Sequence, residues 1–220
     1  MITAVIPVRA GSKRLPNKNI LPFGKSNLLI HKIEQLKQVN GVDKIIVSSD
    51  SEEMLKMAES CGVGIQKRPL EYCDEKSKSF NEVIEYIASN VSGEILMITP
   101  CVCPLIAPSD YKKAILEFLD STSDFDSVIS VKLVKEYLFN ENGALNFSIK
   151  NHVPSQKLPE WFSVINGFYI ARRLDMIKWR FVYGERPKLV DIDKRAAVDI
   201  DDIVDYEMAR FLYEKYNVES

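Results

Sequence analysis

The chain has 220 residues, of which 46% are hydrophobic and 27% are charged, and its formal net charge is −2. This length and apolar fraction predict one domain with a packed core. The small negative charge argues against a general nucleic-acid-binding protein, whose surface is basic. Because Arg9 and Lys13 interrupt the first apolar run, we expect no signal peptide. The apolar stretch at 95–108 is too short for a membrane span and contains three prolines, so we expect a cytoplasmic protein.

A buried strand is predicted at residues 4–8, and it runs directly into a loop rich in positive charge. Gly11 permits a tight turn there, and four cations follow the strand within ten residues: Arg9, Lys13, Arg14 and Lys18. Ligands of open α/β sheets bind beyond the carboxyl ends of the strands, so the loop predicts a site for phosphate or another polyanion. The alternative is a solvated charge run on a surface loop. The loop matches neither a Walker A sequence nor G-x-G-x-x-G.

Predicted helices and strands alternate between residues 27 and 131. Helices are expected to begin at four capping residues: Asn27, Asp50, Ser79 and Ser109. Asp50 with Glu53, and Ser79 with Glu82, resemble capping boxes. Strands are expected at 44–48, 63–66, 95–99 and 127–131. This alternation predicts an α/β fold with a doubly wound, mostly parallel sheet.

The alternation stops between residues 132 and 165, where a polar turn at 140–143 adjoins short β-like pieces such as 144–149. We interpret this region as an antiparallel excursion from the sheet. Such a hairpin often serves subunit contact, and Trp161 and Phe162 are candidate anchors, although both could belong to the ordinary core. Regular structure then returns as strands at 168–171 and 189–190, a short helix at 174–178, and a final helix carrying Val204, Met208, Phe211 and Leu212.

Asp199 and Asp201 lie two positions apart, just before the final helix. On an extended backbone this spacing points both carboxylates to the same side. Two such oxygen ligands beside a phosphate site describe a Mg²⁺ site. Two alternatives stay open: the aspartates cap the final helix, for which Asp202 is well placed, or the equally spaced pair Asp191 and Asp193 is the relevant one.

The cysteines and histidines give no sign of a metal or catalytic site. Cys61, Cys73, Cys101 and Cys103 show no C-x₂-C spacing, so reduced structural thiols are expected. His31 lies in a helical pattern and His152 in a polar loop, and neither has a partner in the sequence. We expect solvent exposure or a local hydrogen bond for both.

The basic loop and the paired aspartates together predict metal-assisted phosphoryl or nucleotidyl transfer, in which cations hold a triphosphate. The same residues carry a family resemblance. IPVRAGSKRLPNKNI at 6–20 resembles the signature of the acylneuraminate cytidylyltransferase (CMP-sialic acid synthetase) family, and AVDIDDIVDYEMA at 197–209 resembles its C-terminal segment. VSSD at 47–50, KRP at 67–69 and NGFYI at 166–170 follow in the family's order.

The resemblance implies a Rossmann-like fold of the nucleotide-diphospho-sugar transferase type, built as a single cytidylyltransferase domain over residues 1–220. It also implies a homodimer, formed through the inserted hairpin at about 132–165. The implied reaction transfers CMP from CTP to the anomeric hydroxyl of an acidic, sialic-acid-like sugar and releases pyrophosphate. Mg²⁺ is the implied cofactor.

Site roles follow from the resemblance, position by position. Arg9, Lys13 and Lys18 match the triphosphate-binding cations, and Gly11 and Ser12 match the loop backbone. Arg68 and Ser79 match positions near the cytosine, Asn19 matches one near the nucleotide, and Asp199 and Asp201 match the metal ligands. The implied catalytic set is Arg9, Lys13, Lys18 and Asp201, while Asp191 and Asp193 fall outside the matching segment.

The sequence departs from the family pattern where the acceptor would bind. Residues 99–106 read TPCVCPLI and lack the family's Gln and Arg, and residues 154–157 lack a further Arg. Gln156 and Lys157 are the candidate acceptor contacts, and surface exposure is the favoured alternative for Lys157. Two other functions therefore stay open: a nucleotidyltransferase acting on a phosphorylated or phosphonate acceptor, and a nucleotide-binding protein without turnover.

Overall fold

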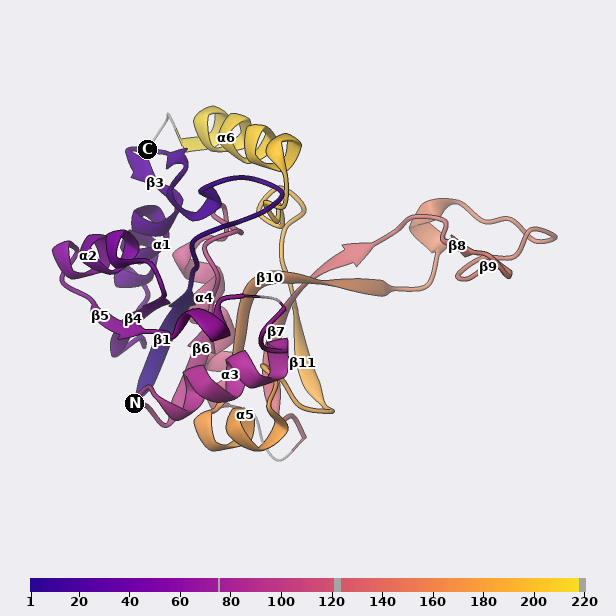
Figure 1. Cartoon of the computed structure of the whole chain (residues 1–220). Coiled ribbons are helices and arrows are strands. Elements are labelled where there is room, and N and C mark those ends of the chain that lie inside the picture. The colour runs from indigo at the N-terminus through magenta and orange to yellow at the C-terminus, as the bar shows by residue number, and fades with distance from the viewer. Residues whose placement is uncertain (75, 121–123, 218–220) are drawn as a thin grey trace.

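A seven-stranded sheet forms the centre of the molecule (Figure 1), for which a computed structural model describes residues 1–74, 76–120 and 124–217. The strand order is β11-β7-β10-β6-β1-β4-β5. The bounds are β1 (Ile2–Pro7), β4 (Lys44–Ser49), β5 (Gly64–Lys67), β6 (Ile95–Ile98), β7 (Ser127–Val134), β10 (Trp161–Arg172) and β11 (Pro187–Asp191). β10 is antiparallel to both of its neighbours, whereas the other pairs are parallel. The expected mostly parallel α/β sheet is confirmed.

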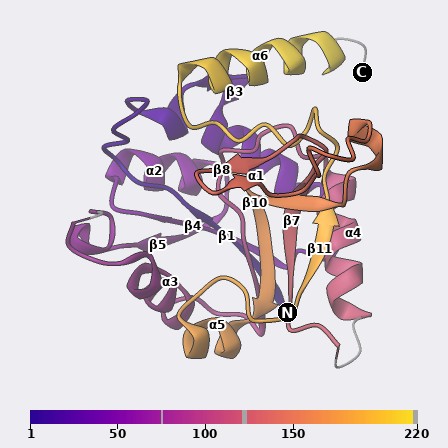
Figure 2. The same cartoon turned by 90° about the vertical axis from the view of Figure 1, so that its right-hand side faces the viewer.

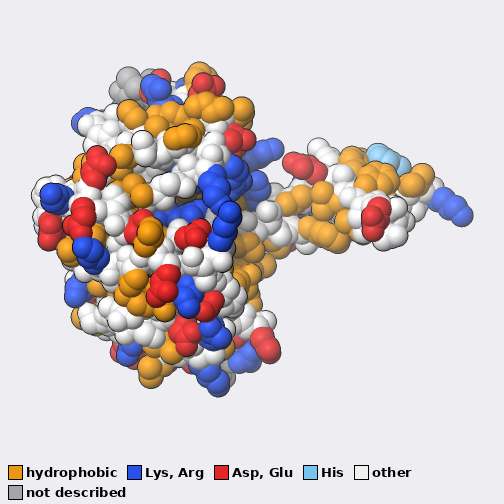
Figure 3. All heavy atoms as spheres, viewed as in Figure 1, with side chains coloured by type: hydrophobic (Ala, Val, Ile, Leu, Met, Phe, Trp, Pro, Cys, Tyr) orange, Lys and Arg blue, Asp and Glu red, His pale blue; other side chains and the backbone are white. Residues whose placement is uncertain are grey.

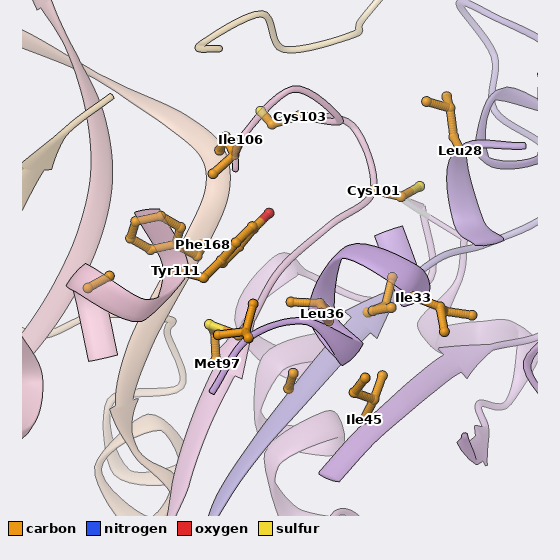
Figure 4. Close-up of a cluster of buried hydrophobic side chains, with 14 of the residues drawn as sticks. Leu28, Ile33, Leu36, Ile45, Met97, Cys101, Cys103, Ile106, Tyr111 and Phe168 are labelled. Carbon is orange, nitrogen blue, oxygen red and sulfur yellow. The ribbon is translucent and has the colours of Figure 1, made fainter. Parts of the chain in front are cut away.

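Helices surround the sheet (Figure 2). They are α1 (Leu28–Lys37), α2 (Glu52–Ser60), α3 (Phe80–Ser89), α4 (Pro108–Leu119), α5 (Arg173–Trp179) and α6 (Ile203–Asn217). Buried side chains of α1, α2 and α4 belong to one apolar cluster, and those of α3 and α5 belong to a second. The first cluster includes Leu36, Met97, Tyr111 and Phe168 (Figure 4). Full burial of each such side chain contributes about 1.5–3 kcal/mol.

The helix starts show which capping residues the chain uses. Asn27 accepts a hydrogen bond from the Ile30 N–H, and Ser79 forms a full capping box with Glu82, as predicted. The box expected at Asp50 is wrong, because Ser51 caps α2 and leaves the Asp50 carboxylate for another partner. The start expected at Ser109 is also displaced, since α4 begins at Pro108, whose fixed φ suits the first helical position.

A long arm leaves the body where β7 and β10 extend beyond the sheet (Figure 1). Its tip holds β8 (Phe139–Asn140), β9 (Gly143–Ala144) and the short helix η3 (Ser155–Lys157). The predicted antiparallel excursion at 132–165 is therefore present, but the strand expected at 144–149 stops at Ala144. The predicted strand at 168–171 is only the inner end of β10, which begins at Trp161 and carries the chain back from the arm.

Helix α6 packs with a different face from the one expected. Val204, Met208 and Phe211 are half or more exposed, whereas Tyr206 and Ala209 are buried. The Tyr206 hydroxyl donates to the Pro22 carbonyl at 2.5 Å, which fastens α6 to the hairpin of β2 (Pro22–Phe23) and β3 (Ser26–Asn27). None of the helices in the described residues is long and apolar enough to cross a membrane.

Candidate active site

A cavity of about 720 Å³ opens at the carboxyl ends of the parallel strands, beside the loop that follows β1. Seven of the predicted site residues line it: Arg9, Ser12, Lys13, Lys18, Asn19, Arg68 and Ser79. Arg14, Tyr72, Cys73 and Lys78 also contribute to the wall. Figure 3 shows Lys and Arg side chains gathered on the body close to the point where the arm leaves it. The fold therefore concentrates the N-terminal cations around one hollow, as an anionic ligand requires.

The loop after β1 is held by bonds to its backbone. Gly11 shapes it by adopting a φ of +73°, in the left-handed region that a glycine tolerates. The Ala10 N–H donates to Asp50 Oδ1 at 3.0 Å, and the buried Asn19 donates through Nδ2 to the Arg9 carbonyl at 3.1 Å. Asp50 thus fixes the cation loop, a role that the sequence-based capping box had misassigned.

Two arginines and a cysteine contact one another in the cavity wall, and one of the arginines, Arg9, comes from that loop. Arg68 is buried, and it donates through Nη2 to the Val8 carbonyl at 2.8 Å and through Nε to Cys73 Sγ at 2.9 Å. Arg9 donates to the Cys73 carbonyl at 2.9 Å. Burial raises the pKa of the Cys73 thiol, although Arg68 partly opposes the shift. Cys73 therefore stays neutral and accepts a hydrogen bond from Arg68.

Ser79 stands at the mouth of the cavity as the N-cap of α3. Its hydroxyl accepts from the Glu82 N–H at 3.3 Å and donates to Glu82 Oε2 at 2.8 Å. The Ser79 N–H and hydroxyl, together with Lys78, lower the pKa of Glu82 to about 2. The Ser79 hydroxyl is thus engaged in capping, and it turns the N-terminus of α3 toward the cavity.

The C-terminal segment before α6 contacts the cation loop beside the cavity, although the predicted site residues Gly11, Asp199 and Asp201 are not among those that line it. Lys18 Nζ donates to the Ile200 carbonyl at 2.7 Å and lies 3.6 Å from Asp201 Oδ1. Arg14 Nη2 lies 2.8 Å from the same carboxylate oxygen. The Ile200 N–H donates to the Val102 carbonyl at 2.9 Å, which anchors the segment to the loop after β6. The fold has therefore brought Asp201 against two cations from the far end of the chain.

Asp199 faces a different neighbour, Asn166 of β10. Asp199 Oδ2 accepts from the Asn166 N–H at 3.1 Å and from Asn166 Nδ2 at 2.8 Å. Asp199 Oδ1 is buried and has no hydrogen-bond partner in the described part of the chain. The segment belongs to no strand, and the two carboxylates contact separate elements: Asp199 contacts β10 and Asp201 contacts the loop after β1.

The alternative aspartate pair is used in local structure. Asp191 Oδ1 accepts from the Leu133 N–H at 2.9 Å, which joins β11 to β7. Asp193 pairs with Arg195 at 3.0 Å, and hydrogen bonds from Arg195 lower the Asp193 pKa. Asp202 accepts from the Val204 and Asp205 N–H groups and so caps α6, as predicted.

Asp199 Oδ1 is chemically suited to a divalent cation, because it is buried and has no hydrogen-bond donor among the described residues. An ionised oxygen buried without a donor is costly unless a cation or water completes it. Mg²⁺ is usually bound by one or two carboxylates together with substrate oxygens and water, so Asp199 and Asp201 suffice as protein ligands. Within the described residues no group of three or more His, Cys, Asp or Glu side chains is arranged around a metal position.

The loop at 99–106 is supported from below by α1. Lys32 Nζ donates to the Cys103 carbonyl at 2.9 Å, and Gln35 and His31 both donate to the Pro104 carbonyl. Burial lowers the pKa of His31 to about 4, so the ring is neutral at physiological pH. The expectation for His31 was wrong, because its ring is partly buried and its hydrogen bond reaches Pro104, 73 residues further along the chain. His152 is exposed on the arm, as expected.

The cysteines are unpaired, as expected. Burial raises the pKa of Cys101 to about 11, and its thiol donates to Asn19 Oδ1 at 3.2 Å.

Gln156 and Lys157, the candidate acceptor contacts, lie in η3 on the arm and are not among the residues that line the cavity.

Sequence reasoning gave no role to Arg14 and Asn166. Arg14 belonged to the predicted cation cluster, and Asn166 opened the NGFYI motif, so both carried a weak signal. Their contacts with Asp201 and Asp199 depend on long-range packing, which the local pattern does not encode.

Relatives of the chain are cytidylyltransferases by name. The pseudaminic acid cytidylyltransferase of Campylobacter jejuni subsp. jejuni serotype O:23/36 is 28% identical, over 98% of this chain and 97% of the relative. The N-acylneuraminate cytidylyltransferase of Escherichia coli O18:K1:H7 is 29% identical, over 98% of this chain and 53% of the relative.

Solved structures show the same fold. CMP:2-keto-3-deoxy-manno-octonic acid synthetase complexed with CTP matches with a TM-score of 0.69 and 18% identity, covering 97% of this chain and 98% of that one. The 4-diphosphocytidyl-2C-methyl-D-erythritol synthase of Anaerococcus prevotii matches with a TM-score of 0.71 and 13% identity, covering 97% and 96%. These likenesses confirm the expected Rossmann-like fold. Because the sequence model of the cytidylyltransferase family matches residues 3–215, nearly the whole length, the chain belongs to that family.

Proposed function

We propose that the protein transfers CMP from CTP to the anomeric hydroxyl of an acidic, nonulosonate-type sugar and releases pyrophosphate. The observation that carries this proposal is the contact of Asp201 with Lys18, a cation that lines the cavity. A triphosphate needs cations along its length and a metal-binding carboxylate at the reacting end, and this arrangement offers both.

The cations would act mainly by position and charge. Arg9, Lys13 and Lys18 line the cavity and would hold the phosphate oxygens. Negative charge grows on the leaving pyrophosphate during transfer, so cations fixed in advance lower the barrier without reorganising. The hydrogen bond from Lys18 Nζ to the Ile200 carbonyl holds the ammonium group near Asp201. From this position Lys18 would contact both the phosphates and the Asp201 carboxylate.

Mg²⁺ is the proposed cofactor, with Asp199 and Asp201 as its protein ligands. The buried, unpartnered Oδ1 of Asp199 supports this assignment. When bound, the ion would neutralise charge on the phosphates and polarise the reacting phosphoryl group. Asp201 would exchange its contacts with Arg14 and Lys18 for contacts that include the ion, which frees both cations to face the nucleotide.

The relatives support an acidic sugar as acceptor, because those named above act on pseudaminic acid and N-acylneuraminate.

We further propose a homodimer formed through the arm, supported by its exposed apolar side chains: Tyr137, Phe139, Leu145, Ile149, Trp161 and Phe162. We also propose that the protein resides in the cytoplasm, because four unpaired thiols suit a reducing compartment.

The test is pyrophosphate release from CTP and Mg²⁺ in the presence of pseudaminic acid, N-acetylneuraminic acid or 2-keto-3-deoxy-manno-octonic acid. Wild-type protein should release pyrophosphate with at least one of them and yield the matching CMP-sugar by mass spectrometry. Lys18→Ala and Asp201→Ala should each lower the rate at subsaturating CTP by about 10- to 100-fold, because each removes a charge-assisted contact. Lys25→Ala is the matched control, since Lys25 is exposed and lies outside the cavity lining.

Three results would contradict the proposal in different ways. Near-wild-type rates in both Lys18→Ala and Asp201→Ala would show that the assigned active site is wrong. Product formed only with a phosphorylated or phosphonate acceptor would reassign the substrate class. CTP binding by calorimetry, with no product from any acceptor, would indicate a nucleotide-binding protein without turnover.

A further inference from the structure

Asn166 makes an unusual pair of contacts with one carboxylate oxygen. Its backbone N–H and its side-chain Nδ2 both donate to Asp199 Oδ2, at 3.1 and 2.8 Å. The Tyr169 hydroxyl donates to Asn166 Oδ1 at 2.9 Å, which fixes the orientation of the amide. Both ends of the Asn166 side chain are therefore committed, and its donors point at Asp199.

The backbone N–H of Asn166 is available because β10 is irregular at this point. The register of β10 against β7 shifts between Val164 and Tyr169, so Asn166 does not pair in the ladder. A bulge of this kind releases backbone groups and re-aims side chains, and such features recur beside active sites. The irregularity thus converts a strand N–H into a donor for a carboxylate 33 residues further along the chain.

The bulge is held in place by buried hydroxyl groups. Ser130 Oγ accepts from the Phe168 N–H at 2.9 Å and lies 3.0 Å from the Ile165 carbonyl, to which it donates. Thr99 donates to the Gly167 carbonyl at 2.8 Å. A Cβ at Gly167 would collide with the side chains of Ile106 and Ser130, so any other residue there would force these buried side chains to move. The position of Asn166 is consequently set by the rigid sheet and not by a mobile loop.

The two donors of Asn166 both bind Oδ2 of the Asp199 carboxylate, and neither binds Oδ1. Asp199 Oδ1 is buried and lacks a partner among the described residues, while Oδ2 is saturated by Asn166. Rotation of the carboxylate would break both contacts with Asn166, so these contacts hold its orientation. A fixed, desolvated and uncompensated anionic oxygen is suited to receive a hard cation.

We propose that Asn166, backed by Tyr169 and the β10 bulge, is a positioning residue that holds the Asp199 carboxylate ready for a divalent cation. This inference rests on the proposed function, because it takes Asp199 as a metal ligand. Asn166 acts through Asp199, in the manner of outer partners that orient metal ligands in other proteins. Loss of such a partner typically weakens metal binding by about 10- to 100-fold.

The experiment measures Mn²⁺ binding to the full chain by electron paramagnetic resonance, without nucleotide or acceptor. Asn166→Ala should raise the Mn²⁺ dissociation constant about 10- to 100-fold, as for loss of a ligand-orienting partner. Tyr169→Phe keeps the ring and removes only the hydroxyl, so a smaller increase in the same direction is expected. Tyr183→Phe is the matched control, because Tyr183 stacks on Tyr169 with ring centroids 6.1 Å apart, whereas the hydroxyl that holds the Asn166 amide belongs to Tyr169.

Two further readouts separate positioning from a general structural role. CTP affinity measured with EDTA should be unchanged in Asn166→Ala, whereas raising the Mg²⁺ concentration should restore much of its kcat. Wild-type Mn²⁺ affinity in folded Asn166→Ala, or in Tyr169→Phe if the first variant does not fold, would overturn the inference. If the Mn²⁺ shift appears but no acidic sugar is converted, the positioning role stands and the proposed acceptor falls.

Discussion

Arg14 Nη2 lies 2.8 Å from Asp201 Oδ1, although the two residues are 187 positions apart in the chain. Both side chains are largely exposed, at 68% and 46%. The pair links a cation of the cavity wall to the carboxylate that is proposed to bind a metal, and it partly neutralises that carboxylate. Because the contact is exposed, it can open at small cost when a nucleotide competes for Arg14.

Arg14→Gln should separate the stability of the protein from its ligand binding. An exposed ion pair is worth about 0–1 kcal/mol, so the free energy of unfolding should change by no more than that. The dissociation constant for CTP should rise about tenfold, because a cation of the cavity wall is lost. Urea unfolding and calorimetry measure the two quantities. Arg210→Gln is the control, since its similarly exposed pair with Glu214 lies on α6. Unchanged CTP affinity in Arg14→Gln would show that Arg14 does not contribute to CTP binding and only pairs with Asp201 in the absence of ligand.

His31 should make stability depend on pH between about 6.5 and 4. Its folded pKa is about 4 because the ring is buried, whereas an unfolded histidine protonates near its usual value of 6.5. The stabilising contribution is complete above pH 6.5 and is lost as the pH falls toward 4, by roughly 3 kcal/mol at most. Urea unfolding at pH 7.5 and 4.5 should show this loss in wild type. The loss should be smaller in His31→Gln and unaltered in His152→Gln, and an equal pH dependence in all three proteins would refute the assignment.

Glu82 should contribute a second, more acidic transition. Hydrogen bonds from Ser79 hold its pKa at about 2, below the usual value of 4.5. Its stabilising effect is therefore present above pH 4.5 and is lost as the pH falls through about 2. Glu82→Gln should lose less stability than wild type between pH 5 and 2.5 in urea titrations. The exposed Glu207 of α6 provides the control through Glu207→Gln.

The arm should determine the oligomeric state. Phe139 and Ile149 are 61% and 74% exposed in the single chain, and large exposed apolar side chains mark interaction surfaces. The double variant Phe139→Glu and Ile149→Glu should convert a dimer to a monomer in light scattering, with an unchanged circular dichroism spectrum. Leu119→Glu, on α4 of the body and also exposed, should leave the dimer intact. A wild-type protein that is monomeric at micromolar concentration would contradict this proposal.

The local sequence pattern predicted the structure correctly wherever a residue interacts mainly with its neighbours in the chain. The strand before Arg9, the caps at Asn27 and Ser79, and the alternation of strands and helices all follow from spacing within a few residues. The pattern failed at Asp50, because Ser51 offered a nearer cap and the loop after β1 offered Asp50 a backbone donor. It also misplaced the buried face of α6, since that face depends on what lies beneath the helix.

The sequence by itself determined the α/β class, the cation loop and the presence of a hairpin excursion, because each is encoded in local periodicity, charge or turn residues. Only the tertiary structure decided that Asp201 meets Arg14 and Lys18, and that Asp199 meets Asn166. Those contacts join segments separated by 33 to 187 residues. They exist because the sheet order and the β10 bulge bring distant backbones together, and no short stretch of sequence carries that information.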